Sequence, residues 1–329
     1  MPVRLVTERV LWSSCPSTET LKRLSREGLG LIVNLTYECR DYRPPEGVEV
    51  LEYPIPDFYF NPPEDVAFRV LEPVRRWLED SDKSVLVHCV GGRGRSGTLI
   101  AMLLVYALGY DASKALSKVE RLGGGPESYV QLNSFRWLAR NLSLLGREGL
   151  LTVYGEGQKF GFGVGIRHAS TVANIAVDVL EALRPALRLE ISAIVAAYVA
   201  GILHDIGRSE TDSNHHKASA KLVLRMKRIG EFADLKLVSR LVYHHRECTD
   251  PLSDSELANW GESCVVAAAA VRLADAFCDI YGPEETYDRV EVVRGKLVVH
   301  GVPLDHERLR RKAELLEKVT GLSVEYTIP

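Results

Sequence analysis

The stretch His88-Cys89-Val90-Gly91-Gly92-Arg93-Gly94-Arg95-Ser96-Gly97-Thr98 decides the fold of the first half of this chain. The apolar run Ser84–Val87 before it predicts a buried strand, and the run Leu99–Leu108 after it predicts a buried helix. Its glycines let the backbone approach a ligand closely and turn its N–H groups inward. A glycine-rich loop that leads into a helix N-terminus forms a cradle for anions. The sequence therefore predicts a strand–loop–helix unit that binds a phosphate group.

The residue types in this loop indicate a nucleophilic site. Cys89 lies at the base of the loop, where inward N–H groups hold its sulfur as the thiolate, which is the nucleophilic form. Arg95 can bind a planar set of phosphate oxygens through two hydrogen bonds. The hydroxyl of Ser96 can hydrogen-bond the sulfur and help it leave. The expected phosphate-binding residues are Val90, Gly91, Gly92, Arg93, Gly94 and Arg95.

The loop resembles that of the protein tyrosine phosphatase superfamily, and within it the small dual-specificity phosphatases. His88 before the cysteine, the glycines inside the loop and Ser96-Gly97 after the arginine carry the resemblance, and the order of elements extends it from Thr7 to Leu145. It implies two in-line displacements through a cysteinyl-phosphate, with no metal or other cofactor. The alternative, a buried cysteine in an ordinary strand-to-helix turn, leaves Arg95 and Ser96 unexplained.

A cysteine-dependent phosphatase also needs an acid that protonates the leaving oxygen. The loop Tyr53–Pro63 contains prolines, aromatic residues and one aspartate, and it resembles the general-acid loop of the family. The match falls on Asp57, which would otherwise be a turn residue after Pro56. The other carboxylate candidates, which follow the same loop, are Glu64 and Asp65. Gln131 resembles a family position near the attacking water, although a solvated helix residue fits it equally well.

Composition bounds the partners and the compartment. The 329 residues carry a formal net charge of −3 with no long run of one sign, so nothing favours binding to nucleic acid or to an anionic membrane. Met1–Val10 has no signal-peptide core, and no apolar run approaches a membrane span. The six cysteines form no CxxC pair. We therefore expect a cytoplasmic protein without disulfides, in which Cys15 and Cys39 are structural. The sequence does not indicate the oligomeric state.

The length suggests two domains, which we place at residues 1–147 and 148–329. The first is expected to be an α/β phosphatase domain with a mostly parallel central sheet, because strands and helices alternate. Its strands are expected at 9–12, 31–35, 48–53 and 84–87, and its helices at 17–26, 65–78, 99–108, 112–121 and 129–142. The six glycines of Gly146–Gly163 predict a linker between the domains.

The second half is expected to be mainly α-helical, with a small C-terminal β-hairpin. Apolar spacing predicts helices at 168–184, 189–206, 214–228, 234–246 and 263–281, a hairpin at 290–299, a helix at 305–320 and a strand at 322–327.

Eight of the nine histidines belong to this half. With Asp205 and Asp275 they form the pattern H…HD…H…H…D, and imidazole with carboxylate suits Fe, Mn, Ni or Zn. The pattern resembles the HD superfamily of metal-dependent phosphohydrolases, and it is most similar to the helical domain that follows the catalytic part of exopolyphosphatases. The resemblance implies one divalent transition metal at His168, His204, Asp205 and Asp275. A second would bind His215 and either His244 or His245.

Several alternatives stay open at this stage. The sequence does not separate His215 from His216, or His244 from His245; Arg208 and Lys217 could bind a substrate phosphate. The main hypothesis is a phosphatase that acts on phosphotyrosine or phosphoserine proteins, or on a small phosphoester. In a second hypothesis the HD domain is the main enzyme, acts on a nucleotide or a cyclic phosphodiester, and passes its product to the phosphatase. In a third, the HD half is a metal-free sensor or docking module.

Overall fold

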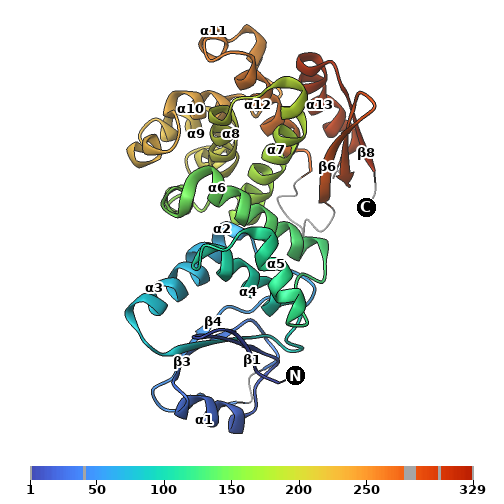
Figure 1. The fold of residues 1–329 in the computed structure, drawn as a ribbon. Helices are drawn as coiled ribbons and strands as arrows, with labels where there is room; N and C mark the ends of the chain where they lie inside the picture. The colour runs from blue at the N-terminus through green and yellow to red at the C-terminus, as the bar shows by residue number, and fades with distance from the viewer. Residues whose placement is uncertain (1, 40–41, 278–286, 303–304, 328–329) are drawn as a thin grey trace. The chain divides into compact units, whose positions relative to one another are not determined.

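The computed structural model describes residues 2–39, 42–277, 287–302 and 305–327. The chain divides into two compact units, Met1–Ser143 and Leu144–Pro329, and each is described by itself (Figure 1).

The first unit is built on a five-stranded sheet with the order β1-β2-β5-β3-β4. Strand β1 pairs antiparallel with β2, and the other neighbours are parallel, so the prediction of a mostly parallel sheet is confirmed. The strands are β1 (Arg4–Thr7), β2 (Val10–Ser13), β3 (Leu29–Asn34), β4 (Glu49–Glu52) and β5 (Ser84–His88). The catalytic strand β5 lies at the centre of the sheet, and its C-terminal end faces the same edge as the ends of β2 and β3.

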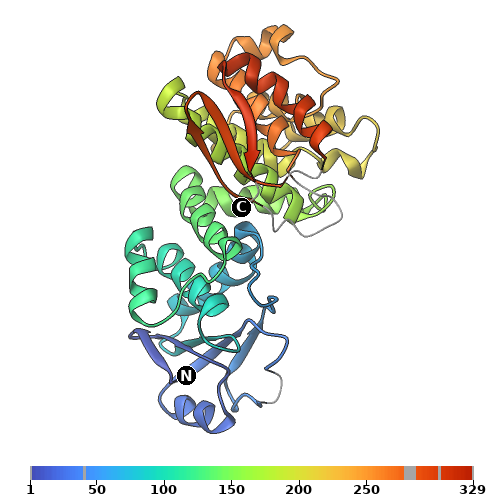
Figure 2. The ribbon, with the colours of Figure 1, turned by 90° about the vertical axis from the view of Figure 1, so that its right-hand side faces the viewer.

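Helices cover both faces of this sheet (Figure 2). Helix α1 packs on one face, where Leu21 and Leu24 contact Ile32 and Leu86 in a buried cluster. Ser17 caps it by accepting the N–H of Thr20 at 3.1 Å. The helical elements of this unit are α1 (Thr18–Arg26), α2 (Pro63–Val66), the π-helical turn Ala67–Leu71, α3 (Glu72–Asp80), α4 (Gly94–Tyr106), α5 (Ala112–Arg121) and the first part of α6 (Tyr129–Gln158).

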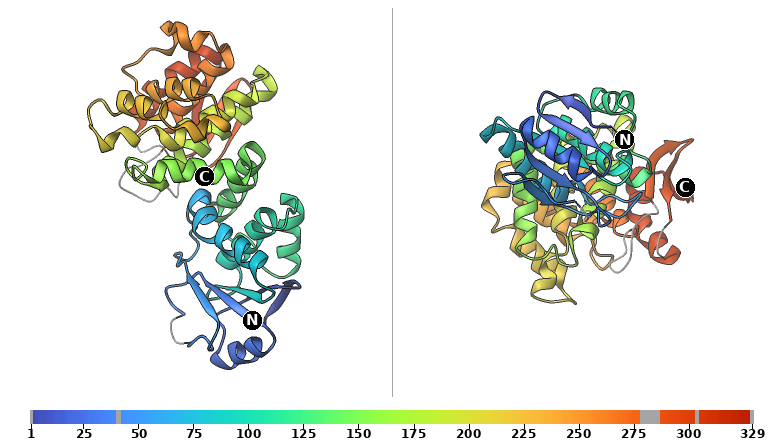
Figure 3. Two further views of the ribbon diagram at one scale, coloured as in Figure 1. Left: turned by 90° about the vertical axis from the view of Figure 1, so that its left-hand side faces the viewer. Right: turned by 90° about the horizontal axis from the view of Figure 1, so that it is seen from below.

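The second unit has a helical core formed by α7, α8 and α12, which contact one another. Its longer helices are α7 (Ile166–Leu187), α8 (Ile191–Leu203), α9 (His215–Val223), α10 (Leu235–Tyr243), α12 (Glu262–Ala274) and α13 (His306–Thr320). Short helical segments lie at Ile206–Ser209, Lys227–Glu231, Pro251–Ser253 and α11 (Ser255–Ala258). A sheet with the order β6-β7-β8 is formed by β6 (Tyr287–Val293), β7 (Lys296–Gly301) and β8 (Ser323–Thr327), beside α13 (Figure 3).

The structure differs from the predictions of local structure at several points. The expected linker at Gly146–Gly163 is largely helical, because α6 continues to Gln158 with a kink at Gly146, where φ is 67°. Strand β1 was not predicted, and β3 begins at Leu29, two residues before its predicted start. The predicted hairpin exists, but β8 joins it in parallel to make three strands. The helix expected over 263–281 ends at Ala274, and its last predicted residues lie outside the described ones.

Among the described residues, Ile191–Ser209 is long and apolar enough to cross a membrane by length and composition alone. The expectation that no apolar run approaches this length was therefore wrong for one segment. Its apolar composition has another cause here, because 83% of the window is buried inside the domain, as in a core helix.

Candidate functional sites

The loop between β5 and α4 places a sulfur at the base of a small cup. The N–H of Gly92 donates to Cys89 Sγ at 3.2 Å, and Ser96 Oγ lies 3.1 Å from the same sulfur. Cys89 and Ser96 are both buried. The structure thus brings these two residues together as the sequence predicted.

The backbone of the cup requires glycine at one position above all. Gly92 has a φ of 69°, and a Cβ there would lie 2.5 Å from the backbone nitrogen of Ser14. A side chain would be strained by the left-handed conformation and would also displace the neighbouring loop.

Arg95 lies under the cup with carboxylates beside it. Its guanidinium is buried, and Nη1 donates to the carbonyl of Ile55 at 2.9 Å. Arg95 Nε lies 3.3 Å from Asp57 Oδ1, and Nη1 lies 3.4 Å from Glu38 Oε2. The structure therefore places Asp57, the predicted general acid, at the cup with its side chain 63% exposed.

The two other candidate acids have different partners. Glu64 accepts a hydrogen bond from Asn141 at 3.2 Å, and Asp65 accepts one from the hydroxyl of Tyr53. Both carboxylates are buried at the start of the helical stretch that follows the loop. This arrangement favours Asp57 over either of them.

Three residues at or near the cup have partners that sequence reasoning did not identify. The indole N–H of Trp12, at the end of β2, donates to Ser96 Oγ at 2.8 Å. Glu38, in the loop after β3, is the second carboxylate on Arg95. Gln131 accepts the N–H of Glu127 at 2.8 Å. Its side-chain amide lies directly beside Gly94, since a Cβ built on that glycine would be 3.0 Å from Gln131 Oε1. The signal that could have found Trp12 and Glu38 is their position at the ends of strands that neighbour β5.

His88 lies at the end of β5 and is held by two contacts. Its Nε2 lies 2.7 Å from the hydroxyl of Tyr42 and Nδ1 lies 3.4 Å from the carbonyl of Cys89. Burial lowers the pKa of His88 to about 4, so the ring is neutral at physiological pH.

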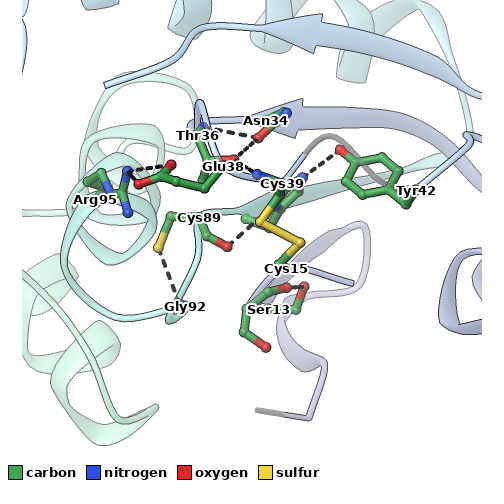
Figure 4. Close-up of a disulfide and its surroundings, with 12 residues drawn as sticks. Ser13, Cys15, Asn34, Thr36, Glu38, Cys39, Tyr42, Cys89, Gly92 and Arg95 are labelled. Carbon is green, nitrogen blue, oxygen red and sulfur yellow. Dashed lines mark hydrogen bonds and ion pairs between the residues drawn. A yellow bond between two sulfur atoms is a disulfide. The ribbon is translucent and has the colours of Figure 1, made fainter. Parts of the chain in front are cut away.

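The structure contains a disulfide between Cys15 and Cys39, which corrects the expectation of a chain without disulfides (Figure 4). The two cysteines are 24 residues apart in sequence, with Cα atoms 6.0 Å apart. They meet because β2 and β3 flank β5 in parallel, so the loops that follow them leave the same edge of the sheet. This long-range adjacency could not be predicted from cysteine spacing.

In the second unit, histidine and aspartate side chains form two trios of possible metal ligands. One comprises His168, His204 and Asp275, and the other comprises Asp205, His215 and His245; all six are buried.

Asp205 connects the two trios. Its Oδ1 lies 3.1 Å from His215 Nε2, and its Oδ2 lies 3.8 Å from both His168 Nε2 and His204 Nε2. Burial alone would raise the pKa of Asp205, but the surrounding imidazoles and Arg208 lower it, so it is a carboxylate.

The hydrogen bonds of the imidazoles fit a cation. Nδ1 of His204, His215 and His245 each faces a backbone carbonyl at 2.7 Å, so each ring donates there and leaves Nε2 as an acceptor. Yet His215 Nε2 and His245 Nε2 lie 3.2 Å apart, and His168 Nε2 lies 3.1 Å from His204 Nε2. Facing lone pairs at such a distance suit a metal ion between His215 and His245, whereas among the described residues no hydrogen bond to Nδ1 fixes the tautomer of His168.

The structure separates the paired histidines that the sequence could not. His215 and His245 join a trio, whereas His244 Nε2 lies 2.6 Å from Asp254 and outside both trios, so the geometry favours His245 of the two alternatives. Neighbouring residues at the end of α10 point in different directions, which explains the difference. His216 is also outside both trios; its ring lies against Tyr243.

Cations from α13 line the cavity above these trios. Arg308 Nη2 donates to Asp275 Oδ2 at 2.8 Å, and the ammonium of Lys312 contacts the same oxygen. The cavity has a volume of about 650 Å³. Its other basic lining residues are Arg208, Arg246 and Arg311. Arg208 thus lies where the sequence expected a phosphate-binding group, and Lys217 is exposed and does not line this cavity.

Two family models match the chain. Residues 7–108 match "Polymorphic toxin system, DSP-PTPase phosphatase", and residues 165–278 match "HD domain".

Two similar curated proteins each align with about a third of this chain or less. The chain is 30% identical over 114 residues to an RNA/RNP complex-1-interacting phosphatase homolog of Caenorhabditis elegans, covering 32% of this chain and 49% of that protein. It is 33% identical over 94 residues to the phosphatidylinositol 3,4,5-trisphosphate 3-phosphatase cnrN of Dictyostelium discoideum, covering 28% of this chain and 14% of that protein. The chain thus spans less than half the length of these relatives.

Similar solved structures include Tk-PTP in its active form, which is 31% identical to this chain. The match covers 42% of this chain and 96% of Tk-PTP, and its TM-score is 0.37. Human DUSP28 is 23% identical, with 44% and 96% covered and a TM-score of 0.37. By the two family models, this chain combines an N-terminal phosphatase domain of the dual-specificity and protein tyrosine type with an HD domain.

Proposed function

We propose that the N-terminal domain, residues 1–147, hydrolyses phosphate monoesters through a cysteinyl-phosphate on Cys89. The observation that carries the proposal is the cup itself: the Cys89 sulfur accepts an N–H from Gly92 at 3.2 Å, and Arg95 and Asp57 lie 3.3 Å apart beside it. A thiolate, a phosphate-binding guanidinium and an exposed carboxylic acid are the three groups that such a reaction needs.

The reaction has two displacements. In the first, the Cys89 sulfur attacks phosphorus, the ester P–O bond breaks and Asp57 gives its proton to the leaving oxygen. In the second, water attacks phosphorus, Asp57 takes the proton, and the S–P bond breaks while the Ser96 hydroxyl hydrogen-bonds the departing sulfur at a starting distance of 3.1 Å. The N–H groups of Val90 to Arg95 and the Arg95 guanidinium balance the charge on the phosphoryl oxygens, so these steps require no metal.

The proposed substrates are phosphotyrosine or phosphoserine proteins, or a small phosphoester. The name of one similar protein gives phosphatidylinositol 3,4,5-trisphosphate as its substrate, which supports testing small phosphoesters beside phosphoproteins. The test is acid quenching with ³²P-labelled substrates of each class, followed by mapping of the labelled peptide. Label on the peptide that contains Cys89 supports the mechanism, and hydrolysis without any label on it contradicts the mechanism.

We also propose that the HD domain, residues 148–329, binds divalent transition metal, Fe, Mn, Ni or Zn, at its two trios. The convergence of acceptor nitrogens of His168, His204, His215 and His245 on Asp205 and Asp275 supports this. A bound metal would supply Lewis-acid polarisation of a phosphoryl oxygen and of water. His204, His215 and His245 hold their Nε2 atoms inward through their Nδ1 hydrogen bonds, and the α13 cations orient Asp275.

Hydrolysis of a nucleotide or a cyclic phosphodiester by this second site is a further candidate function, favoured by the basic cavity above the trios. Metal-dependent phosphodiesterase turnover by the Cys89→Ser protein would support it. A protein that neither retains nor takes up metal would instead support a sensor or docking role for the HD half.

A reducing, cytoplasmic location is part of the proposal, because a thiolate nucleophile needs one. Disulfides are rare in such a compartment, so the Cys15–Cys39 disulfide needs an explanation there.

A further inference from the structure

The Cys15–Cys39 disulfide lies beside the C-terminal end of the catalytic strand (Figure 4). Ser13 at the end of β2 and Asn34 at the end of β3 are both in register with His88 of β5. Cys15 and Cys39 belong to the loops that follow these two flanking strands. The disulfide therefore joins the loops on either side of the loop that contains Cys89.

Both joined loops contact the phosphate cup. The backbone N–H of Cys15 donates to the carbonyl of Val90, the residue after the nucleophile, at 3.0 Å. Cys39 directly follows Glu38, whose carboxylate lies 3.4 Å from Arg95 Nη1. The disulfide thus fixes a carboxylate-bearing loop to the backbone that holds the cup.

The contact between Glu38 and Arg95 depends on the position of that loop. The Glu38 side chain is 51% exposed, so packing alone does not hold it, whereas the Arg95 side chain is 2% exposed. Arg95 Nη1 is bound on one side by the carbonyl of Ile55 and faces Glu38 on the other. Anchoring Nη1 fixes the plane of the guanidinium, which matters because an oxyanion needs two of its N–H groups in one plane.

We propose that the Cys15–Cys39 disulfide is a redox-sensitive site that holds Glu38 as the positioning residue of Arg95, so that reduction of the disulfide weakens oxyanion binding at the cup. This inference rests on the proposed phosphatase function and adds a regulation to the same site. In reducing compartments, disulfides are mostly transient or redox-sensing, which is the behaviour proposed here.

The redox step is a thiol–disulfide exchange with a dithiol reductant. One reductant thiolate attacks Cys15 Sγ, which is the exposed sulfur, and Cys39 leaves as a thiolate that takes up a proton. The second reductant thiol then attacks the mixed disulfide, releasing Cys15 as a thiol and leaving the reductant as a disulfide. Two electrons pass to the protein, and the loop that carries Glu38 loses its covalent attachment.

The test measures the affinity of the full chain for tungstate, an oxyanion that is not turned over, by calorimetry in EDTA. Cys15→Ser/Cys39→Ser removes the disulfide and leaves Cys89 unchanged, and Glu38→Gln removes the carboxylate. Each is expected to weaken tungstate binding about two- to fivefold, the range for an exposed ion pair. Combining the two changes should add nothing further, because both act on one contact.

Matched controls exclude general effects. Glu27→Gln removes an exposed carboxylate that pairs with Arg23 in α1. It should not change tungstate affinity. Reduction of the wild type with dithiothreitol should lower its tungstate affinity to that of the double serine variant. The double serine variant should not respond to dithiothreitol. Because both proteins contain Cys89, any effect of dithiothreitol on oxidised Cys89 would appear in both and can be subtracted. If the double serine variant melts early, Glu38→Gln with and without dithiothreitol gives the same test.

The inference is contradicted if tungstate affinity is unchanged or stronger in the disulfide and Glu38 variants, or if Cys15 and Cys39 alkylate without prior reduction. Aryl phosphate turnover measured in parallel separates this inference from the proposed function. Shifted affinities without turnover in any protein contradict the proposed function and support the redox site, whereas normal turnover with unshifted affinities contradicts the redox site alone.

Discussion

Arg95 is the residue at which the contacts of the cup converge. It is buried, yet Ile55, Asp57 and Glu38 each place an oxygen within 3.5 Å of its guanidinium. The carboxylates differ in position: Asp57 lies at Nε, and Glu38 lies at Nη1. We infer different roles from this difference, with Asp57 donating the proton and Glu38 orienting the guanidinium.

Asp57→Asn tests the first of these roles. It should slow hydrolysis by about a hundredfold for alkyl phosphates, because poor leaving groups depend on proton donation, and by less for aryl phosphates. The ratio of alkyl to aryl rates should therefore fall. Asp65→Asn is the matched control, since Asp65 is bound to Tyr53 instead. A ratio that falls in Asp65→Asn but not in Asp57→Asn would assign the acid to Asp65.

His88 makes a prediction about pH and stability. Its pKa is lowered to about 4 in the folded state by burial, against an ordinary value of 6.5. The unfolded chain therefore binds an extra proton between these values, so this contribution to the free energy of unfolding is full above pH 6.5 and is lost as the pH falls to 4. The loss amounts to at most about 3 kcal/mol.

Urea unfolding between pH 4 and 7 checks this effect in wild type and in His88→Gln, whose amide can still accept from Tyr42. The difference in unfolding free energy between the two proteins should shrink or reverse in favour of the variant as the pH falls. Parallel curves for the two proteins would show that His88 is not the titrating group.

At this scale the sequence predicted the contiguous residues well. Cys89, Arg95 and Ser96 lie in one loop, so their spacing alone brings them together. Trp12 and Glu38 reach the same cup from other strands, and their approach depends on the strand order of the sheet. His244 and His245 are adjacent in sequence, but only side-chain direction shows that His245 faces Asp205 and His244 faces Asp254.

The next scale is that of the elements, where the loop between β5 and α4 depends on its backbone conformation. Gly92→Ala should weaken tungstate binding and aryl phosphate turnover by at least tenfold, because φ is 69° and a Cβ would lie 2.5 Å from Ser14 N. Gly91→Ala is the matched control in the same loop, since a Cβ there meets no atom within 4 Å. It should cause a clearly smaller loss, and equal losses would show that the left-handed conformation of Gly92 is not needed.

Helix α6 explains why a cluster of glycines was misinterpreted as a linker. Two of these glycines allow close packing inside the second unit: a Cβ at Gly149 would lie 2.9 Å from Phe232, and one at Gly157 would lie 2.6 Å from Phe162. Within α6, Gly146 is the glycine that breaks the helical conformation, and Gly161 and Gly163, which also have positive φ, lie after the helix ends. Sequence alone cannot distinguish a glycine needed for a non-helical backbone conformation from one needed for close packing, because the packing partner Phe232 is distant in the chain. Helix α5, which has clear periodicity, was predicted to the residue, and the strands that were predicted in the first unit match to within two residues at each end.

At the scale of the whole molecule, the account requires two sites with separate chemistry. The HD site predicts metal content: wild type purified without chelator should contain divalent transition metal, and Asp205→Ala should lose it, because Asp205 faces both trios. The melting temperature of the HD unit should fall with the metal, since binding is coupled to folding. Elemental analysis and melting curves, with Asp212→Ala as an exposed control, check this. Wild type that is metal-free and does not melt higher with added Mn, Fe, Ni or Zn would contradict it.

The most direct test of the central claim measures aryl phosphate hydrolysis by the full chain in EDTA, for wild type, Cys89→Ser and Asp205→Ala. The account predicts full turnover by wild type and by Asp205→Ala. It predicts no turnover by Cys89→Ser, which should still bind tungstate because the N–H groups of the cup remain. Turnover by Cys89→Ser at the wild-type rate, or its loss in Asp205→Ala, would contradict a thiolate phosphatase in the N-terminal domain.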